Sequence, residues 1–208
     1  MQLIGMFDSP FVRRVAVALD RYGMAFEHQN WSVGKDFETI QARNPLGRVP
    51  ALVLDDGEVL IDSAAILDHL DELAGPQALL PRSGASRRAA LRMMAIATGA
   101  ADKGVAQLYE RRFRPEEKVH EPWLERCRTQ VEAALAELER QVVDGAWLVE
   151  DRFGHADLTA ACVFTFLDDA GMVACSYPKL RALAAKVEAM PEMQATRRPF
   201  SPPVSPRE

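Results

Sequence analysis

The strongest constraint on the fold of this chain is the contrast between its first third and the remainder. Up to residue 74, short apolar runs alternate with helix-periodic stretches in the order strand, helix, strand, helix, strand, strand, helix. After a segment rich in Pro, Gly and Ser at residues 75–86, only helical periodicity continues. Since a mixed segment and a purely helical segment pack into different layers, this contrast predicts an α/β domain followed by an all-α domain.

Each predicted element has a local signal. Strands are predicted at 2–7, 26–30, 51–54 and 58–61, and the helices among them at 11–23, 36–43 and from Asp62-Ser63 onward. Asp55-Asp56-Gly57 is a hairpin turn signal between the last two strands. One face of the helix after Asp62-Ser63 carries Ile66, Leu67, Leu70 and Leu73. Later helices are predicted at 87–113, 122–142, 156–170 and 178–190, the third of them apolar nearly all round and therefore buried.

These elements define the predicted domains. The first domain covers residues 1–76, a linker covers 77–86, and the helical domain covers 87–200. A Pro-rich tail at 201–208 is expected to be extended or disordered.

Composition and charge exclude several classes of protein. With 48% apolar residues and a net charge of −5 over 208 residues, the composition is that of an ordinary globular protein. The acidic balance argues against nucleic acid as a partner, because phosphate binding needs a basic excess. No apolar run of about 18 residues is present, and the N-terminus lacks the features of a signal peptide, so we expect no membrane association.

The cysteines and histidines predict neither disulfides nor a metal site. The cysteines are odd in number and widely spaced, which suits packing residues in a reducing compartment: Cys127, Cys162 and Cys175. The histidines show no ligand spacing and are expected at the surface or at helix caps: His28, His69, His120 and His155. We therefore predict a cytoplasmic protein with no metal.

The first candidate site is Ser9-Pro10-Phe11-Val12-Arg13-Arg14, between the first strand and the first helix. Loop residues at the carboxyl end of a strand face the ligand crevice of an open sheet. A hydroxyl at a helix start, where the dipole favours negative charge, can donate a hydrogen bond to a bound anion. The alternative is that Ser9 acts only as the helix cap, which is the more frequent use of such a serine.

The second candidate site is Asn44-Pro45-Leu46-Gly47-Arg48-Val49-Pro50, directly before a strand. Pro50 has no N–H and cannot donate to a sheet ladder. A cis bond at Val49-Pro50 would bend the chain and expose the backbone of Val49 for pairing with a peptide-like ligand. Since roughly one X-Pro bond in twenty is cis in folded proteins, a trans bond stays the alternative.

The third candidate site is Asp62-Ser63, at the start of the next helix. Both residues are good helix caps, and capping alone would account for them. The free N–H groups of a helix start also bind carboxylates, and the Ser63 hydroxyl can join them. Asp62 could pair with an ammonium on the same ligand, so an amino acid-like group would satisfy both residues.

Taken together and in this order, the strand–Ser9 junction, N-P-L-G-R-V-P and D-G–strand–D-S–A-A-I-L resemble the glutathione transferase superfamily. S-P-F-V-R-R is similar to the serine-containing bacterial members, whereas omega-like relatives carry Cys at the position of Ser9. The resemblance covers essentially the whole chain. It implies a thioredoxin-like N-terminal domain (βαβαββα), an all-helical C-terminal domain and a homodimer.

The resemblance also implies roles for the three candidate sites. Ser9 would hold the glutathione thiolate. Val49, before a cis-Pro50, would pair with the cysteinyl backbone of glutathione. Asp62 and Ser63 would bind its γ-glutamyl end.

Further positions have implied roles outside these motifs. Arg48 and Lys35 would contact the glycyl carboxylate, and Asp102 could reach the glutathione of the partner subunit. The family has Ser or Thr three residues before an Asp at the start of the buried helix, and here Gly154 precedes Asp157. Gly is an acceptable cap, so Asp157 is predicted to serve folding rather than catalysis.

The electrophile would occupy an apolar pocket between the domains. Phe11, Met94 and Tyr109 are candidates for its wall, with ordinary core or surface packing as the alternative. The implied activity is that of a glutathione transferase, in which glutathione, as co-substrate, attacks a small hydrophobic electrophile. A glutathione-dependent peroxidase or disulfide reductase, and a non-catalytic interaction module, stay open. No Cys stands at the position of Ser9, which argues against a protein thiolate as nucleophile.

Overall fold

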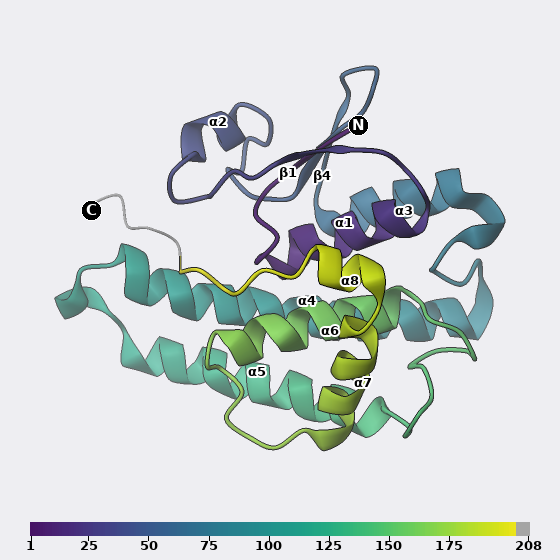
Figure 1. Cartoon of the computed structure of the whole chain (residues 1–208). Helices are drawn as coiled ribbons and strands as arrows, with labels where there is room; N and C mark the ends of the chain where they lie inside the picture. Colours follow the sequence, from purple (N-terminus) through teal and green to yellow (C-terminus); the bar gives the residue numbers. More distant parts are fainter. Residues whose placement is uncertain (203–208) are drawn as a thin grey trace. The chain divides into compact units, whose positions relative to one another are not determined.

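The computed structural model describes residues 1–202 of the chain (Figure 1). By their contacts these residues form two units, one comprising Met1–Ala78 and the C-terminal residues from Pro191, and the other comprising Leu79–Met190. This division differs from the predicted domains at the C-terminal end, where the chain returns to the first unit. The predicted Pro-rich tail at 201–208 lies outside the described residues except for Ser201 and Pro202.

The first unit contains the elements predicted for the α/β domain, in the predicted order. They are β1 (Gln2–Ile4), α1 (Pro10–Arg21), β2 (Glu27–Gln29), α2 (Phe37–Gln41), β3 (Ala51–Val53), β4 (Val59–Ile61) and α3 (Ser63–Ala74). The order βαβαββα is therefore confirmed. The strands are shorter than predicted, because each pairs with its neighbours over only three residues.

The four strands form one mixed sheet in the order β2-β1-β3-β4. β1 runs parallel to β2 and antiparallel to β3, which in turn runs antiparallel to β4. Ile4 pairs with Ala51, and Ala51 pairs with Ile61, so these three residues form one row across the sheet. The carboxyl ends of β1 and β4 and the amino end of β3 consequently lie at the same edge.

Helices α1 and α3 pack against each other, as their apolar spacing predicts (Figure 1). The buried residues of α1 include the predicted ones: Val12, Val15, Ala16 and Leu19. In α3, Ile66, Leu67 and Leu70 are buried, but Leu73 is 55% exposed. The prediction of Leu73 on the core face is wrong, because it lies in the last turn of the helix, where the packing ends.

A short helix that was not predicted, α8 (Pro191–Ala195), packs against α1 (Figure 1). Five residues are too few to show helical periodicity. Their position depends instead on Met193 and Thr196, both buried in the first unit.

The second unit is entirely helical in its long elements, as predicted. It contains α4 (Gly84–Phe113), α5 (Glu121–Gln141), α6 (His155–Asp169) and α7 (Pro178–Glu188). α4 packs against α5 and α6, and α6 packs against α7. Burial of α6 is confirmed on nearly every face. Within residues 1–202, no helix combines the length and the apolar character required to cross a membrane.

Two expectations for single residue types need correction. Cys127 and Cys162 are buried, as expected for packing residues, but Cys175 is exposed in the loop between α6 and α7. His155 is buried at the first position of α6, so the expectation of a surface position is wrong there. Its backbone N–H donates to the carbonyl oxygen of Leu79 at 3.3 Å, which holds this helix start inside the second unit.

Candidate functional site

The three sequence motifs converge at one edge of the sheet. Ile4, Ala51 and Ile61 form the last row at this edge. Gly5 begins the loop that leads to Ser9, and its backbone approaches Val49 so closely that an added Cβ would lie 2.8 Å from the Val49 Cβ. Val49-Pro50 precedes β3 and Asp62-Ser63 follows β4. Strand register therefore brings together segments that are far apart in the sequence.

Ser9 is the N-cap residue of α1, followed by Pro10 at the first helical position. Its Oγ accepts a hydrogen bond from the backbone N–H of Val12 at 3.5 Å, which is at the long limit for such a bond. The capping interpretation is thus confirmed. Because Oγ acts there as an acceptor, its own hydrogen stays available for donation to a ligand.

The loop before Val49 is held by Asn44, which sequence reasoning did not single out. The buried Asn44 side chain donates from Nδ2 to the carbonyl oxygen of Arg48 at 2.8 Å and accepts from the N–H of Leu46 at 3.1 Å. Gly47 has a φ of +61°. An added Cβ there would lie 2.2 Å from Cε2 of Phe37. An Asn directly before Pro, an Asx-turn signal, could have indicated this role.

Val49-Pro50 is a cis peptide bond, as the functional interpretation of this motif required. Within residues 1–202, the backbone N–H and C=O of Val49 form no hydrogen bond with another residue. The main chain at this half-buried position is therefore available to pair with a peptide-like group.

Asp62 and Ser63 begin α3 in different environments. Asp62 is exposed and has a φ of +68°, an unusual value for a residue other than Gly, and its Oδ1 accepts from the N–H of Ala64 at 2.7 Å. Ser63 is buried, and its Oγ accepts two hydrogen bonds from the guanidinium of Arg14. Arg14 belongs to the first sequence motif, but this contact was not predicted, since no local signal links residues 49 positions apart.

The C-terminal residues contact the loop that carries Ser9. The N–H of Ser201 donates to Oδ2 of Asp8 at 3.1 Å, and the Arg198 guanidinium lies 6.0 Å from the centre of the Phe7 ring. Phe7 in turn stacks on His28, with ring centroids 3.8 Å apart. Burial raises the pKa of the Asp8 carboxyl above its usual value. These contacts make the C-terminal segment part of the surroundings of Ser9.

The roles predicted for the remaining residues are not tested by their positions in the structure. Lys35 and Arg48 are exposed in the first unit, and Asp102 is exposed on α4. The proposed pocket residues lie in both units, Phe11 in the first, and Met94 and Tyr109 in the second. Their assignments stay predictions.

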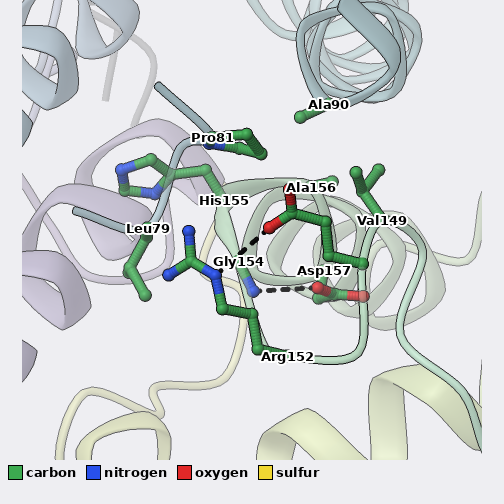
Figure 2. Close-up of a pocket in the computed structure, with 10 residues that line it drawn as sticks. Leu79, Pro81, Ala90, Val149, Arg152, Gly154, His155, Ala156 and Asp157 are labelled. Carbon is green, nitrogen blue, oxygen red and sulfur yellow. Dashed lines mark hydrogen bonds and ion pairs between the residues drawn. The ribbon is translucent and has the colours of Figure 1, made fainter. Parts of the chain in front are cut away.

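Asp157 has the structural role that the sequence predicted. It is fully buried, and its two carboxylate oxygens accept from the N–H groups of Leu148 at 2.8 Å and Gly154 at 2.9 Å. Gly154 and Asp157 line a cavity together with Leu79 and Pro81 (Figure 2), and the volume of this cavity is about 10 Å³. This volume is about that of one water molecule, so the cavity is too small for a substrate.

Comparison with known proteins gives a consistent result. Residues 3–78 match the family model described as glutathione S-transferase, N-terminal domain, and residues 121–185 match glutathione S-transferase, C-terminal domain. The chain is 32% identical to an uncharacterised GST-like protein of Escherichia coli K12 over 81% of this chain and 82% of that protein. It is 30% identical to maleylacetoacetate isomerase of Pseudomonas aeruginosa over 92% of each chain.

A solved structure extends this likeness to the fold. A glutathione transferase family member from Pseudomonas fluorescens Pf-5, crystallised with bound glutathione, superposes with a TM-score of 0.81 at 34% identity. The match covers 96% of this chain and 99% of that one.

Proposed function

The chain belongs to the glutathione S-transferase family, and on that premise we propose that it binds reduced glutathione at the sheet edge defined above and activates its thiol for attack on a small apolar electrophile. The observation that carries the proposal is the row Ile4–Ala51–Ile61. This register gathers a hydroxyl at one helix start, an unpaired stretch of main chain, and an Asp-Ser pair at a second helix start. The glutathione bound to the Pseudomonas fluorescens relative supports the same ligand here.

Each group of the tripeptide has a chemically matched partner in this proposal. The available N–H and C=O of Val49 pair with the cysteinyl main chain. The γ-glutamyl carboxylate meets the Ser63 hydroxyl and the first N–H groups of α3, and the ammonium meets the Asp62 carboxylate. The unusual φ of Asp62 supports this assignment, since backbone strain concentrates at ligand sites. The exposed Arg48 and Lys35 are the proposed cations for the glycyl carboxylate.

The chemistry requires a lowered thiol pKa. A free thiol has a pKa of about 8.5, so only a few per cent is ionised at pH 7. Lowering the pKa by about two units requires about 2.7 kcal/mol of preferential stabilisation of the thiolate. A hydrogen bond from Ser9 to the anion contributes about 1.5–3 kcal/mol and the start of α1 about 0.3–1 kcal/mol. The sulfur then bonds to the electrophilic carbon, and the leaving group departs with its electron pair.

A second candidate is glutathione-dependent isomerisation. The 30% identity to maleylacetoacetate isomerase over nearly the whole chain favours it. A thiolate that adds to a conjugated double bond and then leaves again isomerises the bond and regenerates glutathione. The stoichiometry therefore separates the two: transfer consumes one glutathione per product, whereas isomerisation consumes none. Peroxidase and disulfide reductase activities stay open, and both would use the thiol of glutathione itself.

The resemblance also supports a homodimeric, cytoplasmic protein, in which Asp102 of one subunit reaches the glutathione of the other. Light scattering on the purified chain tests the dimer. If the chain is monomeric at the concentration of the activity assay, this part of the proposal is wrong.

The binding proposal is tested by titrating reduced glutathione into the protein in a calorimeter and by following the melting temperature. We expect a saturable heat and a rise in Tm, because a ligand selective for the folded state stabilises it. Asp62→Ala should weaken binding about tenfold or more through loss of the ammonium partner. Glu72→Ala, which removes the same charge from an exposed position of α3, is the matched control. No heat and no shift in Tm at millimolar glutathione would contradict the proposal.

A further inference from the structure

Arg14 and Ser63 form a buried hydrogen-bonded pair that links α1 to α3, and the geometry of this pair also bears on ligand binding. Arg14 lies in α1 and is 2% exposed, and Ser63 is the first residue of α3 and is 3% exposed. The guanidinium approaches the hydroxyl edge-on, with Nε at 3.1 Å and Nη2 at 2.6 Å from Oγ. Two donors on one planar group thus point at a single oxygen.

This arrangement determines the direction of the Ser63 hydroxyl. A serine Oγ offers two lone pairs and one hydrogen, and a guanidinium has donors but no acceptor. With Nε and Nη2 directed at the oxygen, the hydroxyl hydrogen cannot turn toward Arg14. Within residues 1–202 it finds no other acceptor. A hydroxyl that is nine-tenths buried therefore has an unused donor at the start of α3.

We propose that Arg14 is a positioning residue that holds Ser63 as an obligate donor and thereby selects a carboxylate at the start of α3. The inference rests on the proposed function, in which glutathione occupies this edge, and it identifies how the γ-glutamyl carboxylate is recognised. The buried positive charge of Arg14, placed behind the hydroxyl, strengthens its donation to an anion. A ligand without this carboxylate leaves the Ser63 donor unsatisfied.

The fork geometry makes arginine specific for this role. A lysine would keep the positive charge, but its single nitrogen cannot occupy both lone pairs of Oγ in a defined plane. Arg14→Lys is therefore expected to lose part of the selectivity even though the net charge is unchanged. A merely structural tie between α1 and α3 predicts a different result, namely equal weakening for every ligand of the site.

The experiment compares two ligands on each protein by calorimetry. One is reduced glutathione, and the other is its analogue 4-aminobutyryl-Cys-Gly, which lacks only the γ-glutamyl carboxylate. Arg14→Met should weaken glutathione about tenfold to hundredfold, as expected for a lost hydrogen bond to a charged group, and the analogue less than about threefold. Ser63→Ala should show the same pattern, and the double variant should be no weaker than either single variant.

Controls keep the possible outcomes distinct. Arg21→Met, which removes an exposed cation from α1, should leave both affinities unchanged. Should Arg14→Met fail to fold by circular dichroism, Arg14→Lys carries the same comparison. Equal weakening of both ligands, or an unchanged preference for glutathione, overturns the role of Arg14. If the wild-type protein binds no glutathione, both the proposed function and this inference are wrong. The titration of the wild-type protein with glutathione is therefore performed first.

Discussion

Arg13, in the first turn of α1, donates from Nη2 to the carbonyl oxygen of Met193 at 2.8 Å, across 180 positions of the sequence. Its Nε also lies 3.4 Å from Oγ1 of Thr196. Both partners belong to the short C-terminal segment that includes α8. The segment around Met193 and Thr196 is thereby bonded to the helix whose first residue follows Ser9.

Arg13→Met should loosen α8 and destabilise the first unit. The buried carbonyl of Met193 loses a charged donor, which costs about 1.5–3 kcal/mol. Arg21→Met is the matched control, because Arg21 reaches the same segment through an exposed ion pair with Glu192, worth about 0–1 kcal/mol. Urea unfolding and hydrogen exchange over residues 191–196 measure both. Equal losses in the two variants would contradict the role assigned to Arg13.

Ser9→Ala should reduce turnover far more than it reduces glutathione affinity. Loss of a hydrogen bond of about 1.5–3 kcal/mol to the thiolate lowers kcat roughly tenfold to a hundredfold, while Kd changes less than about threefold. Steady-state kinetics, calorimetry and the ultraviolet absorbance of the bound thiolate check this together. Ser83→Ala makes the same change at another helix N-cap, the exposed residue that precedes α4 in the second unit. Unchanged turnover in Ser9→Ala would remove Ser9 from the mechanism.

Gly47→Ala should destabilise the protein more than Gly23→Ala. Both glycines have a φ in the left-handed region, +61° and +66°. An alanine at either position should therefore lower the unfolding free energy by about 1–2 kcal/mol, because its Cβ disfavours this backbone conformation. Only at Gly47 would the new methyl overlap a neighbour, the Phe37 ring, whereas Gly23 has open space. We expect a further loss of about 1 kcal/mol in urea unfolding. In a Phe37→Ala background the two substitutions should cost the same, and a persisting difference would exclude the overlap as its cause.

Glu137 should contribute to stability in a pH-dependent way. Hydrogen bonds from Arg140, and from Nη2 of Arg92 at 2.6 Å, lower the pKa of its carboxyl from 4.5 to about 2. A depressed folded-state pKa gives stability that is present above pH 4.5 and is lost as the pH falls toward 2. The difference in unfolding free energy between wild type and Glu137→Gln should therefore shrink over this range. In the double variant Arg92→Ala/Arg140→Ala, the change in unfolding free energy caused by Glu137→Gln should depend little on pH.

The patterns that predicted the fold correctly are short-range. Val12, Val15, Ala16 and Leu19 recur at helical spacing, and this periodicity alone indicates which face of α1 is buried. Asp55-Asp56-Gly57 predicts the turn between β3 and β4 because only a few residues decide it. The motifs around Ser9, Val49 and Asp62 were located for the same reason.

The features that were missed depend on partners distant in the sequence. Arg13 and Arg14 are charged and were given no buried role, yet both are enclosed by residues from other elements. The α8 helix has too few residues to show a period, and its place follows from Arg13. The exposure of Cys175 and the burial of His155 were not predicted, because exposure depends on what packs over a residue, which spacing along one chain segment does not reveal.

Local patterns were enough to predict the order of the elements, the faces of the main helices and the three motifs of the candidate site, because each depends on residues within one or two turns of chain. The meeting of these motifs beside the row Ile4–Ala51–Ile61, and the hydrogen bonds from Arg14 to Ser63, became apparent only in the folded chain. Strand register and buried hydrogen bonds join residues tens of positions apart, and packing in three dimensions selects their partners.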